Sequence, residues 1–491
     1  MSSETKTWTI MLYVVADDGL ANFAIESLKQ LQHTAGGNVR VAAQVDLDGS
    51  RQKRAIRRYK FTAPHFGSIE GNEDKGNPVP DNTDMTDPGV LADFITYVWR
   101  QSDLMADHYC LILWGHGPEL LYEVPTKRAN GKGLYFTPLE LRDELEEATK
   151  KNQGKKLDII GMDACSMSMI EYAYELQGLA KFMVASQEEV PDQSFPYDTL
   201  VARFREAPDA ETLCKDGVEY YWKAYDDYVC TDKTGMKSVT LSCLQLNKIS
   251  TIALPLKKLA GVLREVAEVR EGEKLILGAR QNAKGFAGGI FVDIASFCEQ
   301  LLKELSPHKL PGDMTQKLRQ CCDGVRLAIQ PTEGTSECII ANKTGDKSCH
   351  GLSIYFPYLS DGEKKHLEGT RLIKTVGGAQ NDTVKTVGGA QNDTVKTVGG
   401  AQNDTVKNIE IANLAARNIQ YAVRRAVIQD TEAYYNNAKF EFRNIGWFDF
   451  VAYDWCRILV DDEPENLDMR YSAQQCAQNL RHAVQATVGV V

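Results

Sequence analysis

The chain lacks the features that mark membrane, secreted and disulfide-bonded proteins. No apolar run approaches the length of a bilayer span, and the N-terminal stretch MSSETKTWTIMLYVV has neither the basic region nor the small-residue cleavage site of a secretory signal. We therefore expect a cytoplasmic protein. Its 12 cysteines include no Cys-x-x-Cys pair, only the adjacent Cys321 and Cys322, so neither a zinc ribbon nor a thioredoxin-type redox site is indicated. We expect most of these cysteines to be buried, reduced thiols.

An excess of positive charge is missing as well. The net charge of −11 argues against nucleic acids and anionic membranes as partners and favours basic ones. Asp46-Leu47-Asp48-Gly49 lacks the remaining ligands of an EF-hand loop, and the sequence requires no metal ion or other cofactor. With 43% hydrophobic and 25% charged residues, the 491-residue chain has the composition of a soluble globular protein and the length of two or three domains.

Apolar, β-rich runs alternate with helical patterns along the first part of the chain. We expect the strands Trp8–Ala16, Val39–Leu47, Tyr109–Trp114, Leu157–Met162 and Phe182–Ser186. Helical spacing follows from Leu20 to Leu31 and again over Val90–Arg100. This succession of strand–helix crossovers predicts an α/β fold in which a mainly parallel sheet is covered by helices on both faces.

Later segments extend this pattern. We expect further strands over Ser238–Leu246, Gly289–Ile294, Glu337–Ala341 and Gly351–Pro357, with a helix over Leu254–Val266, and these strands would enlarge the sheet. The segment Arg51–Phe61 could form an edge hairpin, although its charges make a solvated ribbon the preferred interpretation.

A cysteine stands where one of these buried strands ends. Leu157–Met162 is followed by Asp163 and Cys165, and Ser168 with Glu171 forms a capping-box pattern that opens a helix. A thiol at the carboxyl end of a parallel strand, facing a helix N-terminus, is favoured as the thiolate. Most cysteines are inert buried hydrophobes, so this assignment needs a base nearby.

A histidine provides that base. Tyr109–Trp114 runs directly into Gly115-His116-Gly117, where the flanking glycines allow a sharp turn and a close approach to a substrate. A histidine in a loop is most often a polar surface residue. Because consecutive strands of a crossover usually neighbour each other, however, we expect His116 and Cys165 on one rim, as general acid–base and nucleophile.

Several motifs resemble the clostripain family of cysteine peptidases. They are WTIMLYVVADDGL, LILWGHG, DIIGMDACSMSMIEYAYEL, VASQEEVPD and GLSIYFP, which together span most of residues 8–357, with a further similar stretch at residues 447–453. The resemblance implies a caspase-like three-layer sandwich, enlarged beyond the minimal caspase core, and a Cys-His dyad of Cys165 and His116. It also implies an oxyanion site from the backbone N–H groups of Gly117 and Cys165, and leaves calcium dependence as an expectation from the family alone.

The family's preference for Arg or Lys on the acyl side of the cut bond has two candidate recognition residues. Asp163 lies two residues before the expected nucleophile, and Asp192 lies in the loop QEEVPDQ after the strand Phe182–Ser186. A carboxylate at the floor of a partly dry pocket can pair with a guanidinium through two hydrogen bonds. For Asp192, an ordinary exposed turn residue after proline is an equally good interpretation.

Two polar segments that contain lysines are candidate processing sites. The loop Glu123–Gly133 lies between the dyad residues and contains Lys127, Arg128 and Lys132, although it could equally be an uncleaved surface loop. Further along, the sequence TVGGAQNDTVK occurs three times without change, over Thr375–Lys407. Its copies are too polar and too few for a solenoid, so we expect a flexible insertion. The lysines that flank the copies are candidate sites for self-cleavage: Lys374, Lys385, Lys396 and Lys407.

These observations predict three regions: a peptidase domain over residues 1–365, the insertion over 366–407, and a helical C-terminal region over 408–491 that partly completes the peptidase core. The predicted function is a cysteine endopeptidase that cleaves proteins after Arg or Lys. It would be held as a latent zymogen and activated by self-processing or by an activating protease or regulator, in a regulatory or stress/defence cascade. Two alternatives stay open, a caspase-fold pseudoenzyme or interaction module, and a thiol acyltransferase or amidase acting on small molecules.

Overall fold

The structure is a computed structural model that describes residues 6–16, 19–47, 56–80, 83–85, 87–117, 136–206, 208–225, 239–287, 289–330, 336–356, 358 and 444–451. Within these ranges, no helix is both long enough and apolar enough to cross a membrane.

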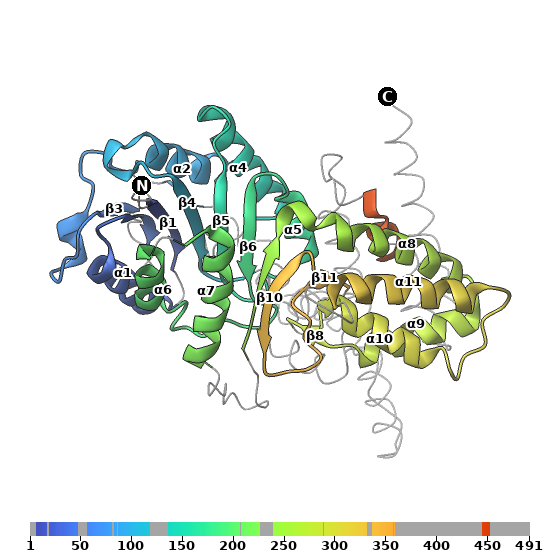
Figure 1. Cartoon of the computed structure of the whole chain (residues 1–491). Helices are drawn as coiled ribbons and strands as arrows, with labels where there is room; N and C mark the ends of the chain where they lie inside the picture. Colours follow the sequence, from blue (N-terminus) through green and yellow to red (C-terminus); the bar gives the residue numbers. More distant parts are fainter. Residues whose placement is uncertain are drawn as a thin grey trace, which may run out of the picture.

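The centre of the molecule is an eight-stranded sheet with the order β10-β7-β6-β5-β4-β1-β2-β3 (Figure 1). The five strands from β6 to β2 run parallel, and the outer strands β3, β7 and β10 are antiparallel to their neighbours. Its strands are β1 (Trp8–Val15), β2 (Val39–Asp46), β3 (Arg57–Phe61), β4 (His108–Trp114), β5 (Leu157–Asp163), β6 (Ala180–Ala185), β7 (Thr240–Gln245) and β10 (Ile339–Thr344). The predicted mainly parallel α/β sheet is confirmed.

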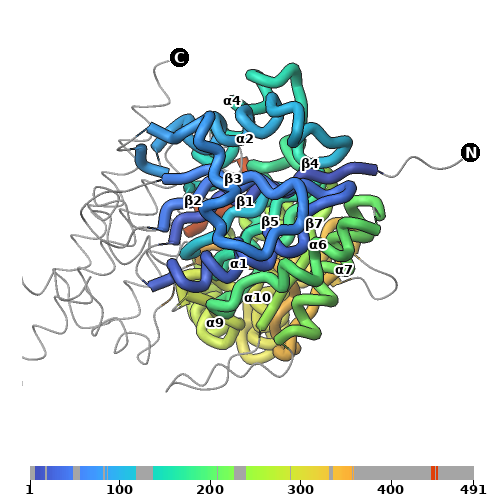
Figure 2. Tube along the Cα trace, turned by 90° about the vertical axis from the view of Figure 1, so that its left-hand side faces the viewer, coloured from blue at the N-terminus to red at the C-terminus, as the bar shows by residue number. Residues whose placement is uncertain are grey.

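Helices cover both faces of this sheet, which explains why β1 and β5 read as continuous apolar runs. In Figure 2 two groups of helices lie above and below the strands. One face carries α1 (Ala21–Thr34), α6 (Tyr197–Arg205) and α7 (Ala210–Tyr225), and the other carries α2 (Val90–Arg100), α4 (Pro138–Lys151) and α5 (Ile170–Glu175). Short 3₁₀ turns lie at η1 (Ile69–Asn72), η2 (Ser102–Leu104) and η4 (Leu246–Lys248).

Helix α4 shows how local sequence sets an element that supports the site. Thr137 and Glu140 form a capping box, with Pro138 in the first turn, so the helix start is fixed by side-chain hydrogen bonds. Leu141, Leu145 and Ala148 then recur on one face and are buried against the sheet.

A second group of elements, the helical module, packs beyond the β6 and β10 side of the sheet (Figure 1). It contains α8 (Ser250–Ala267), α9 (Arg270–Asn282), α10 (Ile294–Glu304), α11 (Met314–Ile329) and α15 (Trp447–Asp449), together with β8 (Gly285–Phe286), β9 (Phe291–Asp293) and β11 (Ser353–Tyr355). These three short strands form a separate antiparallel sheet, in the order β11-β9-β8.

The expectation that Gly289–Ile294 and Gly351–Pro357 enlarge the main sheet is therefore wrong. Strand β9 ends at Asp293, whose side chain accepts a hydrogen bond from Ser296 N at 2.8 Å and so caps α10 at once. A strand of three residues that turns directly into a helix leaves little edge for pairing with a long sheet. Only Ser238–Leu246 and Glu337–Ala341, as β7 and β10, extend the main sheet.

The preferred interpretation of Arg51–Phe61 as a solvated ribbon is also wrong where the structure describes it. Residues 57–61 form β3, paired antiparallel with β2. Tyr59 and Phe61 point inward at alternate positions and are 1% and 0% exposed, whereas Arg57 is exposed and Arg58 and Lys60 are half-buried. Burial of two aromatic rings outweighs the charges of the intervening residues, because those long side chains keep their charged ends near water.

The segment 444–451 packs on the helical module. Trp447 is 1% exposed, and its indole N–H donates to the carbonyl of Tyr355 at 3.0 Å. The ring also packs edge-on against Phe356, with centroids 5.3 Å apart. Most of the predicted insertion and C-terminal region lies outside the described residues, so the division into three regions stays a prediction.

Candidate active site

Cys165 lies in the turn that follows β5, and its thiol has a backbone donor. The N–H of Val190 donates to the Cys165 Sγ at 3.3 Å, and the side chain is half-buried. The next residue, Ser166, has a φ of 55°, in the left-handed region that non-glycine residues rarely occupy. Its N–H donates to the carbonyl of Glu188 at 3.1 Å. Such strain persists only where surrounding contacts over-determine the backbone, so the thiol is held in a fixed place.

The predicted capping box after Cys165 does not form. Helix α5 begins at Ile170, spans six residues and has no side-chain cap. The Ser168 hydroxyl donates instead to the carbonyl of Gly351 at 2.7 Å, and the Glu171 carboxylate accepts from Tyr355 N at 2.8 Å. Both side chains are used to hold β11. The effect of a helix dipole falls off within the first turn, and Cys165 lies before the point where α5 begins. The donor that lies against the Cys165 Sγ is therefore the backbone N–H of Val190 and not the N-terminus of α5.

His116 lies against the same turn. The β4–β5 register pairs Trp114 with Asp163, so both strands end side by side, and Gly115 N donates to Asp163 O at 3.3 Å. Gly117 packs so closely on Cys165 that an added Cβ would collide with the carbonyl of Cys165. His116 itself lines a small apolar pocket with Ala164 and Met167 from the Cys165 turn. The structure therefore places the Gly115–Gly117 segment against the backbone of the Cys165 turn, while the roles of the two side chains stay a prediction.

Asp163 is buried beneath this rim in a network of hydrogen bonds. It is 4% exposed, and its Oδ2 accepts from the Ser194 hydroxyl, from Phe195 N at 3.2 Å and from the Tyr197 hydroxyl at 2.6 Å. The indole N–H of Trp114 donates to the Ser194 hydroxyl at 2.6 Å. Burial raises the pKa of Asp163 to about 6, although the hydrogen bonds from Ser194, Tyr197 and Phe195 act in the opposite direction.

Asp192 lies in a different setting. It is exposed in the turn 191–194, which is closed by a hydrogen bond from Ser194 N to Pro191 O of 2.7 Å. Ser194, at the end of this turn, has a φ of 71°. The turn therefore connects the two candidate acidic residues through Ser194, with Asp163 on its buried side and Asp192 in solvent.

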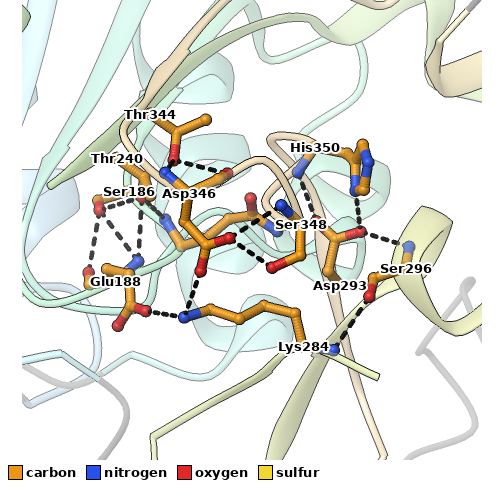
Figure 3. A network of polar contacts seen from close by, with 11 residues as sticks. Ser186, Glu188, Thr240, Lys284, Asp293, Ser296, Thr344, Asp346, Ser348 and His350 are labelled. Carbon is orange, nitrogen blue, oxygen red and sulfur yellow. Dashed lines mark hydrogen bonds and ion pairs between the residues drawn. The ribbon is translucent and has the colours of Figure 1, made fainter. Parts of the chain in front are cut away.

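Two side chains near the nucleophile were not predicted from the sequence. Glu188, in the loop after β6, is 8% exposed and forms an ion pair of 2.7 Å with Lys284 Nζ of the helical module (Figure 3). The next residue but one is Val190, the donor to the thiol. The string QEEVPD draws attention to this loop, but a backbone donor has no side-chain signature, and no spacing rule links Glu188 to a lysine so far along the chain.

The candidate processing residues lie outside the described residues: Lys127, Arg128, Lys132, Lys374, Lys385, Lys396 and Lys407. Within the described part of the chain, no group of three or more His, Cys, Asp or Glu side chains is arranged to hold a metal ion. The calcium dependence implied by the family resemblance stays an expectation.

Solved structures provide one comparison. The X-ray structure of a secreted C11 cysteine protease from Bacteroides thetaiotaomicron, in complex with an irreversible peptide inhibitor, is 15% identical, with a TM-score of 0.49 over 74% of this chain and 97% of that one. The X-ray structure of an inactive zymogen C11 protease from Parabacteroides distasonis is 16% identical, with a TM-score of 0.48 over 76% of this chain and 99% of that one.

Sequence comparisons give a short match and a long one. Cytochrome c2 of Agrobacterium tumefaciens (strain II Chrys) is 33% identical over 79 residues, which make up 16% of this chain and 64%, less than two thirds, of that protein. This chain contains no Cys-x-x-Cys-His, the haem attachment pattern of c-type cytochromes. A sequence model of the clostripain family, peptidase family C11, matches residues 12–332, well over half of the chain. The protein is therefore a member of the clostripain family of cysteine peptidases, as its motifs predicted.

Proposed function

We propose that this peptidase is an endopeptidase in which Cys165 is the nucleophile and His116 the general acid–base, and that it cleaves proteins after Arg or Lys. The observation that carries the proposal is the packing of Gly117, the residue that follows His116, on the carbonyl of Cys165. The Val190 N–H at 3.3 Å from the Sγ adds a donor that favours the thiolate.

The reaction follows from these positions. His116 accepts the thiol proton, and the Cys165 sulfur attacks the substrate carbonyl carbon, which becomes tetrahedral. The backbone N–H groups of Gly117 and Cys165 stabilise the negative oxygen. His116 then protonates the leaving amine as the C–N bond breaks, and a thioester remains. Water, deprotonated by His116, hydrolyses that thioester and restores the thiol.

Basic specificity is assigned to Asp163, with Asp192 as a second acidic contact at the surface. All the hydrogen bonds that Asp163 accepts from described residues reach Oδ2, which leaves Oδ1 for a guanidinium. Because this carboxylate is 4% exposed, the proposal requires the turn that carries Ser194 to shift outward before a substrate group can reach it. The need for such a shift is consistent with a latent enzyme that is switched on in a regulatory or stress/defence cascade.

The proposal includes self-processing within the loop that contains Lys127, Arg128 and Lys132, or in the tandem repeat. It also includes a cytoplasmic location and no required cofactor. Calcium is the ion to test by chelation, because the family resemblance suggests it.

Cys165→Ala and His116→Ala should each lower the rate of hydrolysis of Arg or Lys peptides by more than about a thousandfold, because the two groups act as a unit. The double variant should be hardly worse than either single variant. Steady-state assays with fluorogenic peptides check this. Cys321→Ala and His308→Ala, at other partly buried cysteine and histidine positions, are the matched controls and should leave the rate unchanged. Turnover near that of the wild type in either dyad variant would remove the assignment.

Asp163→Asn should reduce the preference for Arg over neutral peptides by about ten- to a hundredfold, because a desolvated guanidinium loses a charge-assisted hydrogen bond. Ratios of kcat/KM between peptide pairs measure this. Asp158→Asn is the control, since Asp158 is a buried carboxylate at the opposite end of the same strand, where it accepts from Tyr109 N. An unchanged preference in Asp163→Asn would contradict the assignment.

The same variant tests the burial of Asp163 through stability. Its pKa is raised from 3.8 to about 6 in the folded protein. The folded state therefore binds the proton more tightly than the unfolded chain, and the wild type should lose stability relative to Asp163→Asn as the pH rises. The difference in the free energy of unfolding should change by up to about 3 kcal/mol between about pH 4 and pH 7. Parallel denaturation curves at the two pH values would instead indicate an unperturbed carboxylate.

Self-processing predicts fragments in the wild type that are absent from Cys165→Ala. Cleavage after the repeat lysines would give C-terminal fragments that differ by the mass of one TVGGAQNDTVK unit. Intact-mass analysis of both proteins, incubated under conditions in which the wild type cleaves Lys peptides, measures this. If the wild type stays intact under those conditions, the basic loop and the repeat are not self-processing sites.

A further inference from the structure

We propose that Lys284 and Glu188 are positioning residues for the nucleophile: their ion pair holds the 186–190 loop in the conformation in which the Val190 N–H donates to the Cys165 Sγ. The helical module thereby sets the reactivity of a thiol that belongs to the central sheet. This inference rests on the proposed role of Cys165.

The 186–190 loop is bonded to the turn that carries the nucleophile. Because β5 and β6 are parallel neighbours, the segments that follow them leave the same edge of the sheet. Ser168 N donates to the carbonyl of Ser186 at 2.8 Å, and Ser166 N donates to that of Glu188 at 3.1 Å. Together with the bond from Val190 N to the Cys165 sulfur, these two backbone hydrogen bonds join the two segments. A displacement of the loop would therefore move the donor away from the thiol.

The base of this loop is fixed from the sheet side by one hydroxyl group. Thr240 Oγ1, at the start of β7, accepts from Gln187 N at 3.0 Å and from Glu188 N at 3.1 Å. The Ser186 hydroxyl donates to the carbonyl of Glu188 at 2.9 Å. These bonds hold the backbone of residues 186–188, and the side chains of Gln187 and Glu188 anchor the same residues, which lead directly into Val190, from the other side.

Those side chains are held by the helical module (Figure 3). Glu188 Oε1 lies 2.7 Å from Lys284 Nζ, and the same Nζ lies 3.1 Å from Asp346 Oδ2. Gln187 donates to the Asp293 carboxylate at 2.9 Å and accepts from Gly351 N at 2.7 Å. Within this network of described residues, Lys284 is therefore the cation that links Glu188 of the loop to Asp346, in the connection that follows β10.

Electrostatics makes this ion pair persistent. The side chains of Glu188 and Lys284 are 10% and 23% exposed, so water screens their charges only in part. Burial lowers the pKa of Lys284, but the neighbouring charges, Glu188 foremost, outweigh it and hold the pKa above the usual value. Lys284 thus stays charged at any pH at which a cysteine peptidase works, and the bridge does not titrate with the dyad.

The variant Glu188→Gln separates positioning from a simple charge effect. Removing a negative charge near a thiolate should raise the thiolate fraction if charge alone matters. Loss of the bridge should lower it instead, because the Val190 N–H is no longer held against the sulfur. The other titratable groups around Cys165 are the same in every variant: His116 at the end of β4, Asp163 on β5 and Glu189 in the loop.

The measurement is the rate of alkylation of Cys165 by iodoacetamide in the full-length protein, followed from pH 5 to 9 by mass spectrometry of the peptide that contains Cys165. Alkylation requires the thiolate but not turnover, so a latent enzyme can be tested. We expect Glu188→Gln and Lys284→Met to react about tenfold more slowly than the wild type near pH 7, as for the loss of one hydrogen bond to a charged group. Lys284→Arg should restore the rate to within about twofold.

Lys274→Met removes a lysine of the same module that pairs with Glu271 at the surface, and should react like the wild type. If Glu188→Gln does not fold, the variant Asp346→Asn is used in its place. It also removes a negative charge, and it removes one of the two carboxylates that hold Lys284. Faster alkylation of either variant, or a rate equal to that of Lys274→Met, overturns the proposal. Turnover by Cys165→Ala, measured separately, would instead overturn the proposed function.

Discussion

The contact on which the site depends is the packing of Gly117 on the carbonyl of Cys165. No side chain fits at position 117, because its Cβ would occupy the place of that carbonyl. The contact exists because β4 and β5 are parallel neighbours whose last residues, Trp114 and Asp163, are in register. Two separate strand–loop units thus bring the backbone beside His116 against the turn that carries Cys165, and the rest of the fold keeps those two strands in place.

The central sheet and the helical module meet through a polar seam beside the nucleophile. Ser168 and Ser242 both donate to the carbonyl of Gly351 at 2.7 Å, and Ser353 N donates to the carbonyl of Ser168 at 2.9 Å. Hydrogen bonds are directional, so such a seam fixes one relative position, where apolar packing tolerates several. Charged members such as Glu188 and Lys284 are costly to bury unless paired, which makes the seam sensitive to the loss of either partner.

This arrangement links reactivity to distant parts of the chain. The residues that follow β5 and β6 hold the Cys165 thiol. The groups that bind those residues come from the segment after α9 and from the connection between β10 and β11. The same module also receives Trp447, which is buried against Phe356. A change in the position of the helical module would therefore be transmitted to Cys165 through hydrogen bonds that the structure contains.

Periodic patterns allowed most of the main sheet and its helices to be predicted from the sequence. The runs around Trp8, Tyr109 and Leu157 became buried parallel strands, and the Gly-His-Gly and Asp-x-Cys segments lie where such strands end. Hydrogen bonds to residues far along the chain explain why the predicted capping box did not form. Ser168 and Glu171 match a local capping pattern, but both side chains instead bind backbone groups far along the chain, at Gly351 just before β11 and at Tyr355 in it. Local spacing could not reveal that competition.

The most direct test of the central claim is to identify the residue labelled by a short peptide ending in arginine chloromethyl ketone. The thiolate would displace chloride and form a thioether, which peptide mapping locates. The account predicts a single label, on Cys165, formed much faster than with the same reagent carrying a neutral residue in place of arginine. A label on another residue, or equal rates with the basic and neutral reagents, would contradict it.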